Sequence, residues 1–123
     1  MNGWLAVAAA NGFIAVAAGA FAAHGLEGRI DAHALEIFET GARYQMYHAI
    51  AIGLAALAYR SDAASTAGIA AAFFFSGIVL FSGSLYLLAL TGARALGFVT
   101  PFGGLAFLVG WAVLGVAAFK IGQ

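Results

Sequence analysis

Three strongly polar side chains, Asn11, Arg43 and His48, lie inside long apolar stretches of the chain. Such groups are costly at membrane depth, so each raises the hypothesis of a functional site. His48 lies one helical turn after Tyr44, where an imidazole could relay protons or bind a ligand. It could equally be a neutral histidine that hydrogen-bonds to Tyr44 or to a neighbouring helix, because buried polar groups usually find partners. We favour this second interpretation.

The other polar residues at depth have simpler interpretations. Arg43 follows Glu39 by four residues, the favourable order for an ion pair on a helix, so we expect a salt bridge near the membrane surface. Asn11 lies in the middle of its apolar stretch and is expected to hydrogen-bond across helices. Trp111 is central in the last apolar stretch, although indoles prefer the membrane interfaces, and we expect its N–H to reach Asn11.

The sequence lacks the usual catalytic and metal-binding patterns. His24, His33 and His48 do not have the i, i+4 spacing of a helical metal pair. Cysteine is absent, which excludes disulfides and thiolate chemistry. Ser82 and Ser84 flank a glycine, but no base lies near them in the sequence, and no phosphate-binding or dinucleotide fingerprint occurs. We therefore expect a protein that is not an enzyme and holds no metal or cofactor.

The composition indicates which solvent surrounds these residues. Of the 123 residues, 64% are hydrophobic and 8% are charged, whereas soluble domains are about half apolar and about one quarter charged. The five basic residues are scattered and the formal net charge is zero, so nucleic acid is not an expected partner. Membrane lipid is the expected surrounding.

Four stretches are long and apolar enough to cross a bilayer, which takes about 20 residues. They cover about residues 4–23, 41–59, 67–90 and 101–119. The first stretch has no basic segment before it and is longer than a typical signal-peptide core, so we expect a retained span rather than a cleaved signal. The sequence thus predicts one all-α domain over residues 1–123, a transmembrane four-helix bundle.

The connections predict how these helices follow one another. Most ionisable residues gather in residues 25–40, where Asp31 can cap a short interfacial helix that leads into the second span. The other two connections are short, so sequential spans should be antiparallel neighbours. Thr100 and Pro101 are expected to be the N-cap and first residue of the last helix.

Small residues at helical spacing predict the packing faces, because membrane helices associate through close contact of small side chains. The first stretch has one such face, made of Ala8, Gly12, Ala15, Gly19 and Ala22. The third stretch repeats a small residue every seven positions, at Ala70, Gly77 and Ser84, and the fourth does so at Gly103, Gly110 and Ala117. In the second stretch the inward face is expected to be Gly41, Tyr44, Gln45, His48, Ala51 and Ala55, opposite Met46, Ile50, Leu54 and Leu57.

Four local strings occur in order along nearly the whole chain. They are GAFAAHGL at residues 19–26, YQMYHA at 44–49, LFSGSLY at 80–86, and TPFGG at 100–104 with Gly110-Trp111. With these strings the sequence resembles the YgdD/YwdK-like small bacterial inner-membrane proteins, domain-of-unknown-function family 423, which has relatives in animal mitochondria.

The resemblance implies four spans and a retained first helix, but it implies no activity. Ala22 departs from the family, which commonly has glycine there, and the residue remains small. The family strings contain the polar positions already noted, so the resemblance implies a candidate polar cluster toward one end of the helices. Its members are His24, Tyr44, His48, Ser82, Ser84 and Tyr86.

Charge does not decide the orientation, since Arg60 and Lys120 would face one side and Arg29 and Arg94 the other. The α-amino group, together with the basic C-termini of the family that the chain resembles, favours a multi-pass protein of the inner membrane with both termini in the cytoplasm.

Three functional hypotheses follow from the sequence. The leading one is a non-enzymatic structural or accessory subunit that packs with itself or with a larger membrane complex. The second is an oligomeric channel or transporter for a proton or small solute, based on Asn11, Tyr44, Gln45 and His48. The third is a lipid or quinone binder that uses Phe73, Phe74, Phe75 and Phe81.

Overall fold

The computed structural model describes residues 2–59 and 63–121, which fold into four long helical segments. The first is α1 (Gly3–Phe21), which continues into a π-helical turn, η1 (Ala22–Leu26), and the second is α2 (Ala32–Ala58). The third joins α3 (Ala64–Gly77), the π-helical turn η2 (Ile78–Ser82) and α4 (Gly83–Thr91). The fourth joins a 3₁₀ turn, η3 (Arg94–Phe98), to α5 (Thr100–Lys120).

Three of these segments are long and apolar enough to cross a membrane: Gly3–Leu26, Ala64–Thr91 and Arg94–Lys120. With 27 residues, α2 is also long enough, at roughly 40 Å. It is less apolar because its first half carries Glu36, Glu39 and Arg43. The predicted all-helical fold with apolar spans is confirmed for the described residues, and α2 as a fourth span stays a prediction.

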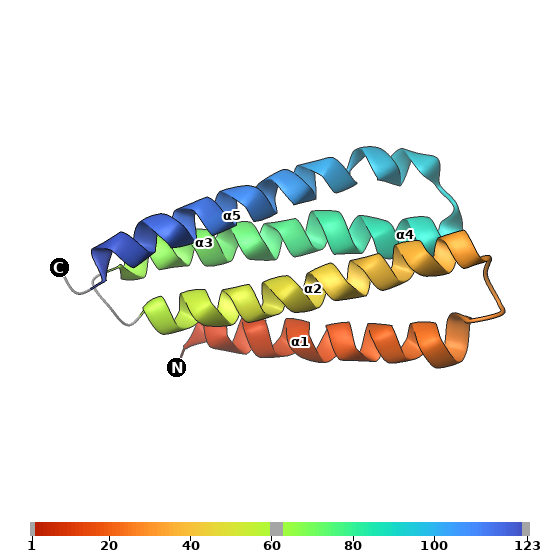
Figure 1. The fold of residues 1–123 in the computed structure, drawn as a ribbon, viewed down its shortest axis with the longest axis horizontal. Helices are drawn as coiled ribbons and strands as arrows, with labels where there is room; N and C mark the ends of the chain where they lie inside the picture. The colour runs from red at the N-terminus through yellow and green to blue at the C-terminus, as the bar shows by residue number, and fades with distance from the viewer. Residues whose placement is uncertain (1, 60–62, 122–123) are drawn as a thin grey trace.

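The four segments form an open row. α1 packs mainly on α2, α2 packs on both α3 and α4, and α5 packs mainly on α3 and η2. Figure 1 views the molecule down its shortest axis and shows α1 and α5 at opposite margins of the row. Consecutive segments are antiparallel, as predicted. A closed bundle would bring the first and last helices together. In the row, Ala8 of α1 lies against Gly53 of α2, while Gly103 and Gly110 of α5 lie against Phe81 and Phe74.

Local sequence explains where the helices begin and end. Asn2 caps α1 by accepting a hydrogen bond from the Leu5 N–H at 3.1 Å, and its amide donates to the Ala56 carbonyl on α2 at 3.1 Å. Asp31 caps α2 by accepting from the Ala34 N–H at 2.7 Å, as predicted. Gly28 and Gly92 turn the chain after η1 and α4 with φ of 83° and 71°, a region in which glycine meets no steric penalty.

Two predicted boundaries were wrong. The segment after Asp31 is no separate interfacial helix but the first three turns of α2, which continues without a break to Ala58. The last helix begins at Thr100 itself and not at Pro101, because η3 runs directly into it. The Thr100 hydroxyl is therefore not a cap, and it faces Ser84 across the helix interface.

The seven-residue stripes of α3 and α5 do form the interface between these helices. A β-carbon on Gly77 would lie 2.3 Å from the Phe107 ring, and one on Gly110 would lie 2.7 Å from the Phe74 ring. At Gly103 the nearest atom would be the Phe81 backbone nitrogen, at 2.4 Å. At Gly103 the helices therefore approach at backbone distance, whereas at Gly77 and Gly110 the absence of a side chain makes room for an aromatic ring of the facing helix.

The stripe on α1 is only partly confirmed. Ala8, Ala15 and Ala22 are buried, whereas Gly12 and Gly19 are half-buried with open space where a side chain would project. The reason is that α1 packs mainly on α2 and meets α3 only near its start, where Trp4 lies close to Gly68. On α2 the predicted faces are correct except at Tyr44, which is 37% exposed.

Candidate functional site

The first polar network joins α1, α2 and α4 through three side chains in the core. The Tyr86 hydroxyl donates to Gln45 Oε1 at 2.7 Å, and Gln45 Nε2 donates to Asn11 Oδ1 at 3.1 Å. Asn11 Nδ2 then donates to the Val7 carbonyl at 2.9 Å. Asn11 and Gln45 are buried, and the Tyr86 ring packs on Phe38 with centroids 4.8 Å apart. The sequence prediction that Asn11 bonds across helices is confirmed, with Gln45 as the partner.

The second network is built around His48 and joins α2 to α5. Nδ1 of His48 lies 2.7 Å from the Tyr44 carbonyl, and Nε2 lies 3.1 Å from the indole nitrogen of Trp111. A carbonyl can only accept a hydrogen bond and an indole N–H can only donate one. Nδ1 of His48 therefore carries the proton, and Nε2 accepts the hydrogen bond from Trp111. The ring also stacks on Phe107, with centroids 3.5 Å apart and an interplanar angle of 6°. His48 is thus a neutral histidine with both nitrogens engaged.

This arrangement corrects one prediction and refines another. The Trp111 N–H reaches His48 and not Asn11, because α5 packs on α3 and contacts α2, whereas α1 packs mainly on α2. His48 does bond to Tyr44, but to its backbone carbonyl rather than its hydroxyl. The sequence reasoning did not single out Phe107, although it lies one turn from both Gly103 and Trp111 and so shares their face.

Hydroxyl groups form a third set of contacts around η2. Ser82 is fully buried and donates to the Gly41 carbonyl on α2 at 2.7 Å. The Ser84 and Thr100 hydroxyls lie 2.6 Å apart and join α4 to α5. π-helical turns frequently occur at functional sites. Here the turn ends at Ser82, which bonds to another helix.

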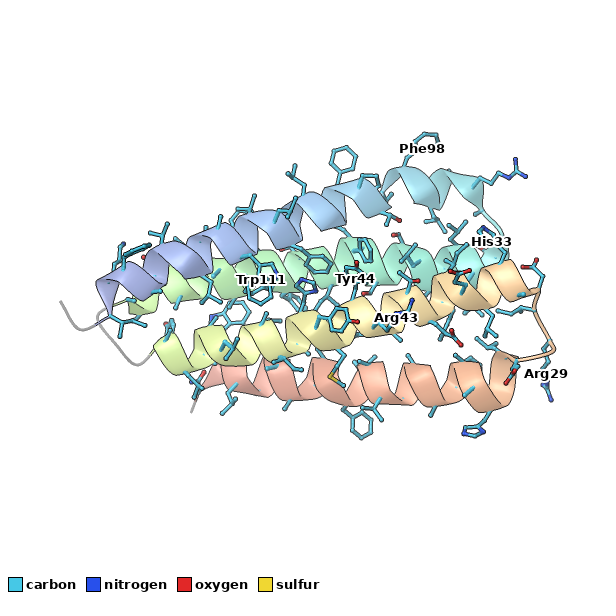
Figure 2. The ribbon with its side chains drawn as sticks, viewed as in Figure 1. Arg29, His33, Arg43, Tyr44, Phe98 and Trp111 are labelled. Atoms are coloured by element: carbon cyan, nitrogen blue, oxygen red, sulfur yellow. The ribbon has the colours of Figure 1, made fainter. Side chains whose placement is uncertain are left out.

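Two predicted site residues lie at the surface. Arg43 is exposed and donates to the Thr40 hydroxyl at 3.0 Å, and it forms no ion pair with Glu39, so that prediction was wrong. An exposed, long and flexible arginine side chain gains little from an exposed ion pair. His24 is exposed on η1, and no hydrogen bond or ring contact among the described residues joins it to the polar groups of α2. Figure 2 shows Tyr44 and Trp111 over the middle of the row, with Arg43 nearer the end that carries Arg29 and His33.

The cluster implied by the family strings is therefore divided. Tyr44, His48, Ser82, Ser84 and Tyr86 lie along the middle of α2 and on η2 and α4, where they belong to separate networks. The phenylalanines considered for a lipid or quinone site do not share a face either. Phe74 and Phe81 pack toward α5 at Gly110 and Gly103, whereas Phe73 and Phe75 are exposed.

The chemistry open to these networks is limited. Among the described residues, no buried side-chain nitrogen or oxygen lacks a hydrogen-bond partner, and no group of three metal-ligating side chains occurs. Each network ends at a backbone carbonyl, that of Val7, Tyr44 or Gly41. The arrangement can fix helices against one another, a role in which interhelical hydrogen bonds each contribute about 0.6 kcal/mol in membrane proteins.

The chain is similar to known proteins along its length. The DUF423 family, described as proteins of unknown function, matches residues 18–104. The UPF0382 membrane protein YwdK of Bacillus subtilis is 46% identical over 98% of both chains. The UPF0382 inner membrane protein YgdD of Escherichia coli is 44% identical over 95% of this chain and 89% of its own. No solved structure gives a significant match.

Proposed function

Since the chain belongs to the DUF423 family of membrane proteins of unknown function, we propose a role from its own residues. It is a non-enzymatic structural protein of the bacterial inner membrane, and it acts by packing with copies of itself or within a larger membrane complex. The observation that carries this proposal is that the buried polar side chains of the described residues all have hydrogen-bond partners within the protein, and that several of these bonds join its helices.

The same observation argues against catalysis and conduction. A proton relay needs groups that can accept and release protons in sequence. The amides of Asn11 and Gln45 do not titrate in the ordinary pH range, and both nitrogens of His48 are occupied. Every buried side-chain nitrogen and oxygen of the described residues already has a hydrogen-bond partner within the protein. What remains for interaction is the outer surface.

On α1, this outer surface has features that suit the packing of another helix. Gly12 has open space where a side chain would project, and with Ala9 and Met46 it borders shallow apolar grooves between α1 and α2. Small residues allow another helix to approach closely, which is how membrane helices associate. Since α1 lies at one margin of the row, its outer side is available to a second copy or to another protein.

The proposal includes α2 as a fourth span. Glu39 lies 19 residues before Ala58, or roughly 28 Å along the helix, which is close to the hydrocarbon thickness of about 30 Å. Its charged first turns would then lie in the headgroup region at the end that carries Arg29 and Arg94. The ends of α1 and α5 that hold the chain termini would lie at the opposite surface, in the cytoplasm.

The test is the mass of the complex released gently from native membranes, with identification of every component. A homo-oligomer or a reproducible larger complex supports the proposal, and a lone monomer at native expression contradicts it. Gly12→Leu should weaken the assembly because the added side chain would occupy the α1 surface. Gly115→Leu on α5 is the matched control, since Gly115 also has no atom within 4 Å of an added β-carbon.

A further inference from the structure

A groove runs between the first turns of α2 and the end of α4, at the charged end of the row. Its outer part has a volume of about 460 Å³ and is bordered by Asp31, His33 and Arg94, with Ile37, Leu88 and Ala89 as apolar lining. A second hollow of about 200 Å³ lies beside it, lined by Glu36, Thr40 and Leu85, and His33 and Ile37 line both. We call these two parts together the interfacial groove.

With the two candidate spans crossing the membrane, the groove would lie where the headgroup region meets the hydrocarbon. One apolar segment ends at Thr91 and the next begins at Arg94, so the outer part lies at the ends of two candidate spans. Leu85 lies six residues before Thr91, or roughly 9 Å deeper along the helix. The groove thus changes from charged to apolar in the direction in which a phospholipid changes from headgroup to acyl chain.

The charges on the rim are of both signs. Arg94 is exposed, and no hydrogen bond or ion pair within the described residues uses its guanidinium. A guanidinium with free donors matches two phosphate oxygens at once. Glu36, which lines the smaller hollow, is exposed, and its carboxylate is likewise unused among the described residues. Asp31 accepts the capping bond of α2 through only one of its oxygens.

From this charge complementarity we propose that the interfacial groove binds a zwitterionic phospholipid with a primary ammonium headgroup, phosphatidylethanolamine. The phosphate lies on Arg94, the ammonium donates to the carboxylates of Glu36 and Asp31, and one acyl chain follows Ile37, Leu88 and Leu85. A purely anionic lipid would place its headgroup against two carboxylates, which is unfavourable. This site is independent of whether the protein assembles with itself.

The test is native mass spectrometry of the purified full chain in detergent, titrated with phosphatidylethanolamine, phosphatidylglycerol and phosphatidylcholine of identical acyl chains. The wild type should retain phosphatidylethanolamine best. Arg94→Gln should weaken phosphatidylethanolamine and phosphatidylglycerol alike, roughly tenfold, because both share the phosphate. Glu36→Gln should remove the preference for phosphatidylethanolamine over phosphatidylcholine, because only the primary ammonium donates hydrogen bonds.

The matched control is Arg29→Gln, which removes an exposed cation at the same end of the row without touching the groove. It should leave retention of all three lipids unchanged. Equal losses in Arg29→Gln and Arg94→Gln, or a wild-type preference for phosphatidylglycerol, would overturn the proposal. Unchanged lipid retention in Arg94→Gln would do the same. All three side chains are exposed, and melting curves of the variants verify that folding is intact.

Discussion

His48 is fixed on three sides, by a carbonyl of its own helix, by the indole of Trp111 and by the face of Phe107. An imidazole held in this way has one tautomer and no free nitrogen. The hydrogen bond that joins α2 to α5 therefore accounts for the presence of a histidine in this apolar part of the chain. The energetic coupling between His48 and Trp111 tests this interpretation.

We predict measurable coupling in a double-mutant cycle of His48→Phe and Trp111→Phe. Each single variant leaves one polar group, the Trp111 N–H or His48 Nε2, without its partner, and the double variant leaves neither. The coupling free energy should be about 0.6 kcal/mol, the average for hydrogen bonds between membrane helices, and at most about 1.7 kcal/mol. Unfolding in mixed micelles of increasing denaturing detergent measures it. Strictly additive losses would show that the contact contributes nothing.

A second prediction concerns the network of Tyr86. Tyr86→Phe keeps the ring on Phe38 but removes the hydroxyl that donates to Gln45. The variant should lose about 0.6 kcal/mol of unfolding free energy in the same assay. Tyr47→Phe is the matched control, because Tyr47 is 51% exposed and its hydroxyl takes part in no hydrogen bond among the described residues. A loss in Tyr47→Phe as large as that in Tyr86→Phe would contradict the assignment.

At the scale of the elements, the interface of α5 with η2 depends on one glycine. Gly103→Ala would place a β-carbon 2.4 Å from the Phe81 backbone nitrogen, an atom that cannot move aside as a side chain can. We expect a loss of about 1–3 kcal/mol, which is typical of overpacking. Gly104→Ala is the control, since its nearest atom would be 3.9 Å away. Equal stability of the two variants, measured by thermal unfolding in detergent, would show that the helices can separate at no cost.

These contacts also indicate how far the sequence could predict the structure. The periodicity of small and polar residues predicts which face of a helix is inward, and this holds for α3, α5 and most of α2. Periodicity along one helix does not state which other helix lies against that face. The partner of Trp111 and the open positions of Gly12 and Gly19 depend on the order of the row, and that order was not visible in local patterns.

At the scale of the whole molecule, the flat row has a consequence for its surroundings. A closed bundle would hide the inner sides of α1 and α5, whereas the row exposes large apolar side chains on all of its helices, for example Phe13, Leu57, Val79 and Leu108. Lipid covers such a surface without penalty. The small residues of α1 then become the part of the surface where another helix can approach more closely than lipid does.

The number of spans decides where the connecting loops lie. If α2 crosses the membrane, the turn after η1 and the turn before η3 lie on the same side, opposite the ends of α1 and α5. If α2 lies on the surface, these two turns lie on opposite sides, because only one apolar segment then separates them. The chain contains no cysteine, so single cysteines introduced at Glu27, Ala95 and Ile121 would be its only thiols.

We predict that Glu27→Cys and Ala95→Cys react with a membrane-impermeant maleimide on intact spheroplasts, and that Ile121→Cys reacts only after permeabilisation. All three positions are exposed in the protein, so burial does not limit the reaction. Labelling of Glu27→Cys and Ala95→Cys from opposite sides would remove α2 as a span. Labelling of both only from the inside would keep the four spans and reverse the orientation, placing the termini and Lys120 outside. The positive-inside rule leaves this choice open here, since basic residues lie at both ends of the row.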